Sequence, residues 1–172
     1  MERTCFAAMA VYLATFLLTT YGVSMQALAL ALALVALGNL AGNVLGGWLA
    51  DRVTARPLAF AAASAATGAL ALPLMLWRPG LTASVVLGFA YSLANAAGRP
   101  ALMAALSEVP AEVRGALLGL NVTMSSLGWL GATALGGWLI GRHGFGSLGI
   151  LAAAAAGAGA LLAAAAWRAR RW

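Results

Sequence analysis

Side chains that could perform chemistry are scarce in this sequence. Among its 172 residues are four acidic residues, one histidine (His143) and one cysteine (Cys5). A single cysteine excludes an internal disulfide and a cysteine-based metal cluster, and a single histidine makes no metal site. No Ser/His/Asp set or pair of carboxylates falls within the apolar segments. The residue pattern therefore argues against an enzyme and indicates neither a metal nor another cofactor.

The polar residues within the apolar segments are instead spaced to share helix faces. Tyr91 and Asn95 are four residues apart, as are Asn39 and Asn43, and this spacing places both members of a pair on one side of a helix. We expect Asn39 and Asn43 to mark either a helix contact or a hydrated cavity. The residues expected to line a substrate path are Tyr12, Thr15, Thr19, Tyr91 and Asn95.

Arg99 is the one charged residue expected inside a predicted membrane span. It lies about 18 residues after Leu81, or roughly 27 Å along a helix at 1.5 Å per residue, nearly across a hydrocarbon core of ~30 Å. Arg99 is therefore predicted either to reach the membrane interface or to bind an anion or act as a gate at the floor of the substrate path. All four acidic residues fall outside the predicted spans, so no carboxylate is expected for proton coupling.

The composition places these residues in a membrane. Hydrophobic residues make up 63% of the chain and charged residues 8%, against roughly 25% charged residues in soluble domains. At ~20 residues per span plus loops, six spans fit and eight do not. The net charge of +6 comes from ten arginines scattered at the ends of apolar runs, which argues against a nucleic-acid partner, because that would need a basic patch on one face.

The apolar runs predict an all-α integral membrane protein with six spans. Most arginines fall in loops on one side, and the positive-inside rule then places both termini in the cytoplasm, in a membrane expected to be the cytoplasmic (inner) membrane of a bacterium. The expected helices are Cys5–Val23, Ala27–Ala50, Leu58–Trp77, Leu81–Leu106, with a bend near Gly98 and Pro100, Arg114–Ile140 and Ser147–Trp167.

A repeat organises these helices. Segments Leu37–Arg52 and Leu127–Arg142 share nine of sixteen residues at a period of 90. An odd number of helices per copy inverts the second copy, so we predict one six-helix bundle of two inverted three-helix repeats, residues 1–80 and 81–172. Small residues allow close helix contact in lipid, either inside this bundle or where it rocks against a second one. The residues assigned to such a bundle interface are Gly38, Asn39, Gly42, Asn43, Gly46, Gly128 and Gly131.

The end of the first copy resembles a known loop motif. The run G-G-W-L-A-D-R is similar to the G-x-L-a-D-R motif of major facilitator superfamily transporters, although Ala55 and Pro57 depart from its glycine and second basic residue. Residues 110–121 resemble the start of that family's penultimate helix, and the six helices match its helices seven to twelve. The motif and gating residues that the resemblance implies are Gly47, Asp51, Arg52, Arg56 and Arg114.

The resemblance also implies roles for the helices and a partner. The first and fourth would line the substrate path, the second and fifth would face an opposing bundle, and the third and sixth would face lipid. The family has twelve helices, so this chain would be the C-terminal half of a transporter, or a half-size homodimer, that moves a small molecule by alternating access. Efflux of amphipathic compounds is one expectation. The alternative is a non-transporting scaffold or a truncated remnant.

Overall fold

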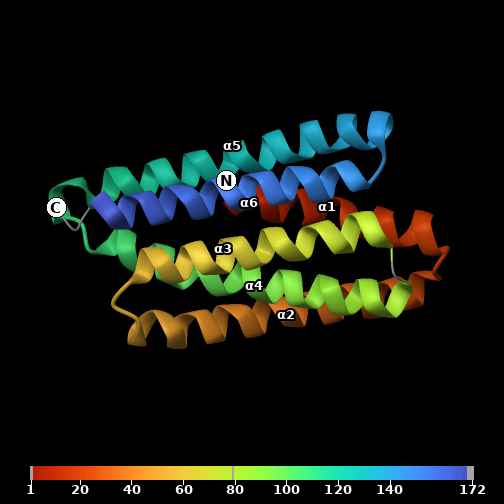
Figure 1. Cartoon of the computed structure of the whole chain (residues 1–172), viewed down its shortest axis with the longest axis horizontal. Coiled ribbons are helices and arrows are strands. Elements are labelled where there is room, and N and C mark those ends of the chain that lie inside the picture. The colour runs from red at the N-terminus through yellow and green to blue at the C-terminus, as the bar shows by residue number, and fades with distance from the viewer. Residues whose placement is uncertain (1, 79, 170–172) are drawn as a thin grey trace.

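The chain folds as a bundle of long helices. The computed structural model describes residues 2–78 and 80–169, and no strand occurs among them (Figure 1). All six predicted helices are present, and their ends lie within three residues of the predicted ones. The elements are α1 (Glu2–Tyr21), α2 (Met25–Arg52), α3 (Arg56–Leu72) with the π-helical turn η1 (Pro73–Trp77), α4 (Leu81–Ser107), α5 (Ala111–His143) and α6 (Gly146–Ala169).

Local sequence explains where several helices begin. The backbone N–H of Ala27 donates a hydrogen bond of 3.3 Å to Oγ of Ser24, which caps α2. Pro57 occupies the first turn of α3, where its missing N–H costs nothing. Near Gly98 and Pro100, where the sequence predicts a bend, α4 stays helical through both residues. One lost backbone hydrogen bond inside a packed membrane helix is tolerated.

Five of the described helical segments are long and apolar enough to cross a membrane. They are α1, α2, α3 together with η1, α4 and α6. The longest helix, α5, has 33 residues but is not among them. Its hydropathy is lowered by glycines and by polar residues such as Asn121, Thr123 and Ser125. The sixth span expected from the sequence is therefore present as a helix but is the least apolar of the six.

The contacts between helices are the same for both halves of the chain. In the structure α2 packs against α4, α1 against α5, and α3 against α6. Exchanging the first three helices with the last three converts the α2–α4 pair into the α5–α1 pair and leaves α3–α6 unchanged. Three helices per half also reverse the direction of the second half (Figure 1). These contacts are the ones expected of two inverted repeats, while the boundary at residues 80 and 81 stays a prediction.

The repeated sequence makes the same contact in both halves. The guanidinium of Arg52 lies 3.8 Å from the ring centroid of Trp48 at the end of α2, and that of Arg142 lies 4.9 Å from Trp138 at the end of α5. A cation over an indole face is a favourable pair. The repeated residues thus close two helices at opposite ends of the bundle.

The glycine stripe of α2 faces the interior of this bundle. A Cβ on Gly38 would lie 2.5 Å from the carbonyl oxygen of Phe89, and Gly42 and Gly46 are equally close to the backbone of α4. Of the two alternatives for these three glycines, the structure shows packing inside the bundle, because α4 covers them. In the other copy, Gly128 lies against Thr4 of α1, whereas Gly131 has open space around it.

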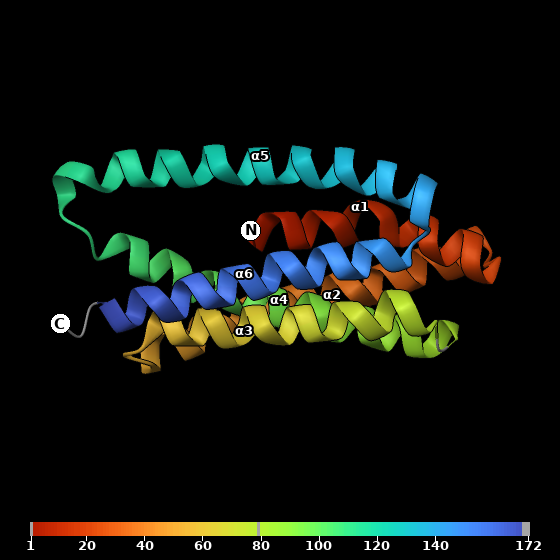
Figure 2. The same ribbon diagram turned by 45° about the horizontal axis from the view of Figure 1, so that its top comes forward.

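The first half of α5 stands away from the other helices. Residues 111–120 are exposed except for Leu117, and Figure 2 shows this half of α5 separated from α6 and α4. The second half holds α5 to α1, where Gly136 lies against the ring of Tyr12. The structure therefore leaves space beneath the first half of α5, and that space matters for the site.

Candidate functional site

A cavity of about 370 Å³ lies between α1, α2 and α4. We name it the α2 cavity. Most of its wall is apolar, and its polar groups come from Asn39, Tyr91 and Ser92. The residues that line it are Phe6, Met9, Ala10, Leu13, Leu32, Val35, Ala36, Asn39, Leu74, Gly88, Tyr91 and Ser92.

The amide of Asn39 carries a buried donor that has no partner. Nδ2 of Asn43 donates to the backbone oxygen of Asn39 at 2.9 Å and to its Oδ1 at 3.1 Å. Within the described part of the chain, nothing accepts a hydrogen bond from Nδ2 of Asn39. An unpaired buried donor costs about 1–3 kcal/mol. The hydrogen bonds of Asn43 thus stay within α2 and make no contact with another helix, whereas Asn39 lies at a cavity.

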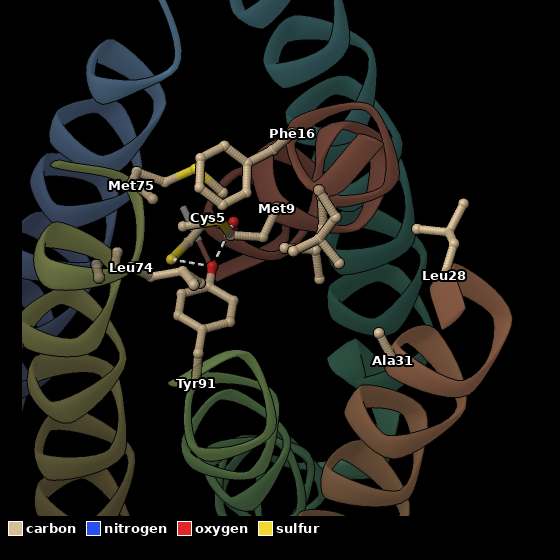
Figure 3. Close-up of a cluster of buried hydrophobic side chains, with 13 residues drawn as sticks. Cys5, Met9, Phe16, Leu28, Ala31, Leu74, Met75 and Tyr91 are labelled. Carbon is tan, nitrogen blue, oxygen red and sulfur yellow. Dashed lines mark hydrogen bonds between the residues drawn. The ribbon is translucent and has the colours of Figure 1, made fainter. Parts of the chain in front are cut away.

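Tyr91 ties α4 to α1 beside this cavity. Its hydroxyl donates to the carbonyl oxygen of Cys5 at 2.6 Å and lies 3.1 Å from the Cys5 sulfur. Figure 3 shows Tyr91 pointing from α4 toward Cys5 and Met9, with Met75 and Phe16 beyond them. The ring of Tyr91 is free to form part of the cavity wall, while its hydroxyl is already engaged.

One turn along α4 from Tyr91, a polar cluster joins α4 to the start of α1. Nε of Arg99 donates to Oε1 of Glu2 at 2.9 Å, and Nη2 lies 3.5 Å from Oδ1 of Asn95. The same guanidinium lies 4.7 Å from the ring centroid of Phe6. The side chains of Arg99 and Glu2 are 18% and 11% exposed. Arg99 therefore neither extends to solvent nor stands unpaired.

This cluster corrects an expectation about carboxylates. The sequence analysis placed no acid within a span, but α1 begins at Glu2, three residues before the expected start at Cys5. Glu2 thus belongs to a helix long and apolar enough to cross a membrane. The signal that could have revealed it is its position three residues before Cys5, within one helical turn of the apolar run.

A larger cavity of about 580 Å³ lies beneath the first half of α5. We name it the α5 cavity. Its charged wall residues are Glu2 and Arg3, and Asn121 and Ser125 add polar groups from α5. The remaining lining is apolar: Pro57, Phe60, Ala101, Leu102, Ala105, Leu106, Val109, Leu117, Met124, Gly159, Leu162, Ala163 and Ala166.

The polar residues expected on the first helix lie outside both cavities. The hydroxyl of Tyr12 donates to the backbone oxygen of Thr133 on α5. Thr15 and Thr19 are exposed, and Oγ1 of Thr19 donates to the backbone oxygen of Thr15 at 2.8 Å. The cavity-facing residues of α1 are instead Phe6, Met9, Ala10 and Leu13, because α1 is rotated so that its hydroxyl-bearing residues face away.

Residues of the loop motif gather where α2 ends and α3 begins. Nε of Arg56 donates to the backbone oxygen of Ala50 at 3.3 Å, and its Nη1 pairs with Glu108 at the end of α4. Arg56 therefore joins three helices within the bundle. Asp51 is exposed, and no hydrogen bond or ion pair of Asp51 occurs within residues 2–78 and 80–169.

The other two motif positions also lie at the surface. A Cβ on Gly47 would meet nothing within 4 Å. Nη2 of Arg114, at the start of α5, donates to the backbone oxygen of Val109 at 3.1 Å. Asp51 and Gly47 thus present open positions, whereas Arg52, Arg56 and Arg114 already contact their own bundle.

A search of known proteins identifies the fold and the general activity. The family model of the Major Facilitator Superfamily matches residues 3–171. No curated protein and no solved structure matches the chain. No group of three or more His, Cys, Asp or Glu side chains suited to a metal occurs in the described part of the chain. Since the matched region spans nearly the whole sequence, the protein is an integral membrane protein and belongs to the major facilitator superfamily of transporters.

Proposed function

We propose that the α2 cavity is the substrate site and that this bundle moves an amphipathic small molecule by alternating access together with a second six-helix bundle. The unpaired Nδ2 of Asn39 carries the proposal, because a bound acceptor would satisfy it. Apolar walls from α1, α2 and α4 suit the body of an amphipathic molecule better than a sugar. The second bundle is either another copy of this chain or an N-terminal half.

The outer faces of α2 and α5 support the need for a second bundle. On α2, Leu40, Val44 and Trp48 are more than half exposed, as are Val122 and Leu130 on α5. These side chains lie on the sides of α2 and α5 that their own bundle does not cover. An opposing bundle that covered both faces would bury these apolar side chains and supply the second half that an alternating-access cycle requires.

The direction of the bundle in the membrane follows from its charges. The α2–α3 and α4–α5 connections and the end of α6 lie at one end (Figure 1). This end carries Arg52, Arg56, Arg114 and Arg168, and we name it the arginine-rich end. The positive-inside rule places it in the cytoplasm. Arg170 and Arg171, which extend the same charge pattern, lie outside the described residues.

Reconstituted protein should carry amphipathic ions across a bilayer. We expect proteoliposomes that contain the purified assembly to take up radiolabelled naphthalene-1-sulfonate or (1-naphthylmethyl)trimethylammonium faster than protein-free liposomes, with saturation. Asn39→Ala should slow uptake of the sulfonate about tenfold, because it removes from the cavity the free donor that would bind a sulfonate oxygen. Thr19→Val, outside both cavities, is the matched control. If folded protein in lipid takes up neither ion, the proposed function is wrong.

Asp51 should act on the second bundle rather than on its own. Its carboxylate is exposed at the arginine-rich end, where it could meet the positive N-terminal end of α5, with Arg114 and Gly115, in an opposing copy. We expect Asp51→Asn to lower the population closed at that end about fivefold, measured by distances between spin labels on α2. Asp51→Glu should restore it. Glu108→Gln is the control, because Glu108 pairs internally with Arg56. An unchanged population in Asp51→Asn would contradict this role.

A further inference from the structure

We infer that the transported molecule is an amphipathic organic anion. Its anionic group binds the Arg99 guanidinium as the molecule passes, at the position that the Glu2 carboxylate occupies when no substrate is present. This inference rests on the proposed transport function and names its substrate class. The observations that carry it are the position of the Glu2–Arg99 pair between the two cavities, the unused donors nearby, and a second cation beside Glu2.

The pair lies where the two cavities approach each other. Glu2 lines the α5 cavity, and Phe6, one turn further along α1, lines the α2 cavity. Arg99 contacts both residues: its Nε binds Glu2 at 2.9 Å and its guanidinium lies 4.7 Å from the ring centroid of Phe6. A molecule that moves between the cavities along α1 must therefore break the contact of Arg99 with Glu2 or with Phe6.

Donors exceed acceptors along this route. The Arg99 guanidinium has five N–H groups, and its hydrogen bonds go to one carboxylate and to the side chain of Asn95. In the α2 cavity, the Nδ2 of Asn39 is a donor without an acceptor in the described part of the chain. Among the residues that the structure describes, the charged groups of the route are Arg99, Arg3 and Glu2, with a net charge of +1. An anion rich in acceptor oxygens matches these groups, whereas a cation would meet two arginines and a carboxylate already paired.

Glu2 has a second partner to which it can turn. Its Oε2 lies 3.4 Å from Nε of Arg3, which is 37% exposed. When an incoming anion takes the Arg99 guanidinium, Glu2 keeps its interaction with Arg3 and is not left as an isolated buried charge. Such an isolated charge is the large cost of breaking a buried pair. The exchange therefore replaces one charge-assisted hydrogen bond with another.

Binding of an anion and its neutral analogue tests the inference directly. The assay measures binding of radiolabelled naphthalene-1-sulfonate and naphthalene-1-sulfonamide, which share shape but not charge, to the full chain in lipid nanodiscs. We expect the wild type to bind the sulfonate about tenfold more tightly. Glu2→Gln should strengthen sulfonate binding about tenfold further, because the competing carboxylate is gone, and should change sulfonamide binding less than twofold.

Two variants separate the local effect from a general change in charge. Glu108→Gln removes a carboxylate that lines neither cavity, and sulfonate binding should stay unchanged. Arg99→Gln should abolish the preference for the sulfonate. Equal binding of the two compounds by the wild type, or sulfonate binding by Glu2→Gln no tighter than by the wild type, would overturn the inference.

Binding and uptake report on different claims. If the predicted sulfonate preference appears but proteoliposomes take up neither ion, the transport function fails and the anion site stands. If proteoliposomes take up the trimethylammonium ion and nanodiscs show no sulfonate preference, the transport function stands and the anion inference fails.

Discussion

Leucine in place of Gly42 is expected to prevent α2 from packing against α4, whereas leucine in place of Gly47 leaves the bundle folded. A Cβ at position 42 would press on the carbonyl oxygen of Leu93 and lie 2.8 Å from Cβ of Ala96. These atoms belong to a helix backbone and to a Cβ fixed on it, so they cannot rotate away. Overpacking commonly costs about 1–3 kcal/mol, and a rigid contact belongs at the upper end.

The structure of α2 explains why nothing compensates for this loss. The buried residues of α2 are mainly small: Leu28, Ala31, Gly38, Gly42, Gly46 and Ala50. In lipid the burial of apolar surface adds little, and close backbone approach holds helices together. Separating α2 from α4 by the width of a side chain therefore removes most of what holds α2.

Thermal unfolding in detergent measures the difference between the two glycines. The midpoint temperature of Gly42→Leu should fall by about 6–12 °C, since 1 kcal/mol corresponds to about 2–4 °C for a domain of this size, or the variant should elute as aggregate. Gly47→Leu, where a Cβ meets nothing within 4 Å, should stay within ~2 °C of the wild type. Equal midpoints for the two variants would show that the stripe does not set the helix contact.

The glycine stripe also shows what sequence can predict about such a bundle. The spacing of Gly38, Gly42 and Gly46 identified a smooth face on one helix, and the repeat predicted a second helix with a similar face. Neither pattern says which helix covers the face, because glycine fits against any backbone. Only the arrangement of all six helices settles that α4 covers it.

The structure places the residues predicted for the substrate path on both inward and outward helix faces. Tyr91 and Asn95 are near the site because the whole face of α4 that carries them turns inward. Thr15 and Thr19 are exposed. A hydroxyl is weak evidence for an inward face, because it can satisfy itself on the carbonyl four residues earlier, as Thr19 does. Polarity alone could not orient α1, because its apolar residues are spread around the helix and do not gather on one side.

Glu2 was missed through a small error in a helix boundary. Helix ends predicted from hydropathy are uncertain by two or three residues, because the terminal turn of a helix need not be apolar. Because α1 begins three residues earlier than expected, the carboxylate of Glu2 belongs to α1 and pairs with Arg99, the one arginine expected within a span. A boundary error of only three residues therefore concealed an ion pair.

The Glu2–Arg99 pair yields the second large prediction. Arg99→Leu should lower the free energy of unfolding by about 3 kcal/mol, because it leaves the carboxylate of Glu2, 11% exposed, with only its longer contact to the partly exposed Arg3. Adding Glu2→Leu should restore most of that loss, since two apolar side chains can pack where the ion pair was. Titration with sodium dodecyl sulfate in mixed micelles, followed by circular dichroism, measures both variants.

The rescue in the double variant decides what Arg99 does. A double variant as unstable as Arg99→Leu would mean that Arg99 stabilises the bundle through Phe6 and Asn95 rather than by neutralising Glu2. A full rescue means that the pair stabilises little by itself and is costly only when one member stands alone. That asymmetry suits a transporter: at 1.4 kcal/mol per tenfold, a cost of about 3 kcal/mol keeps the Glu2–Arg99 pair closed in all but roughly 1% of the molecules. An anion that binds Arg99 offsets that cost with a new charge-assisted hydrogen bond while Glu2 keeps its contact with Arg3, and the molecule that carries the anion then passes between the cavities.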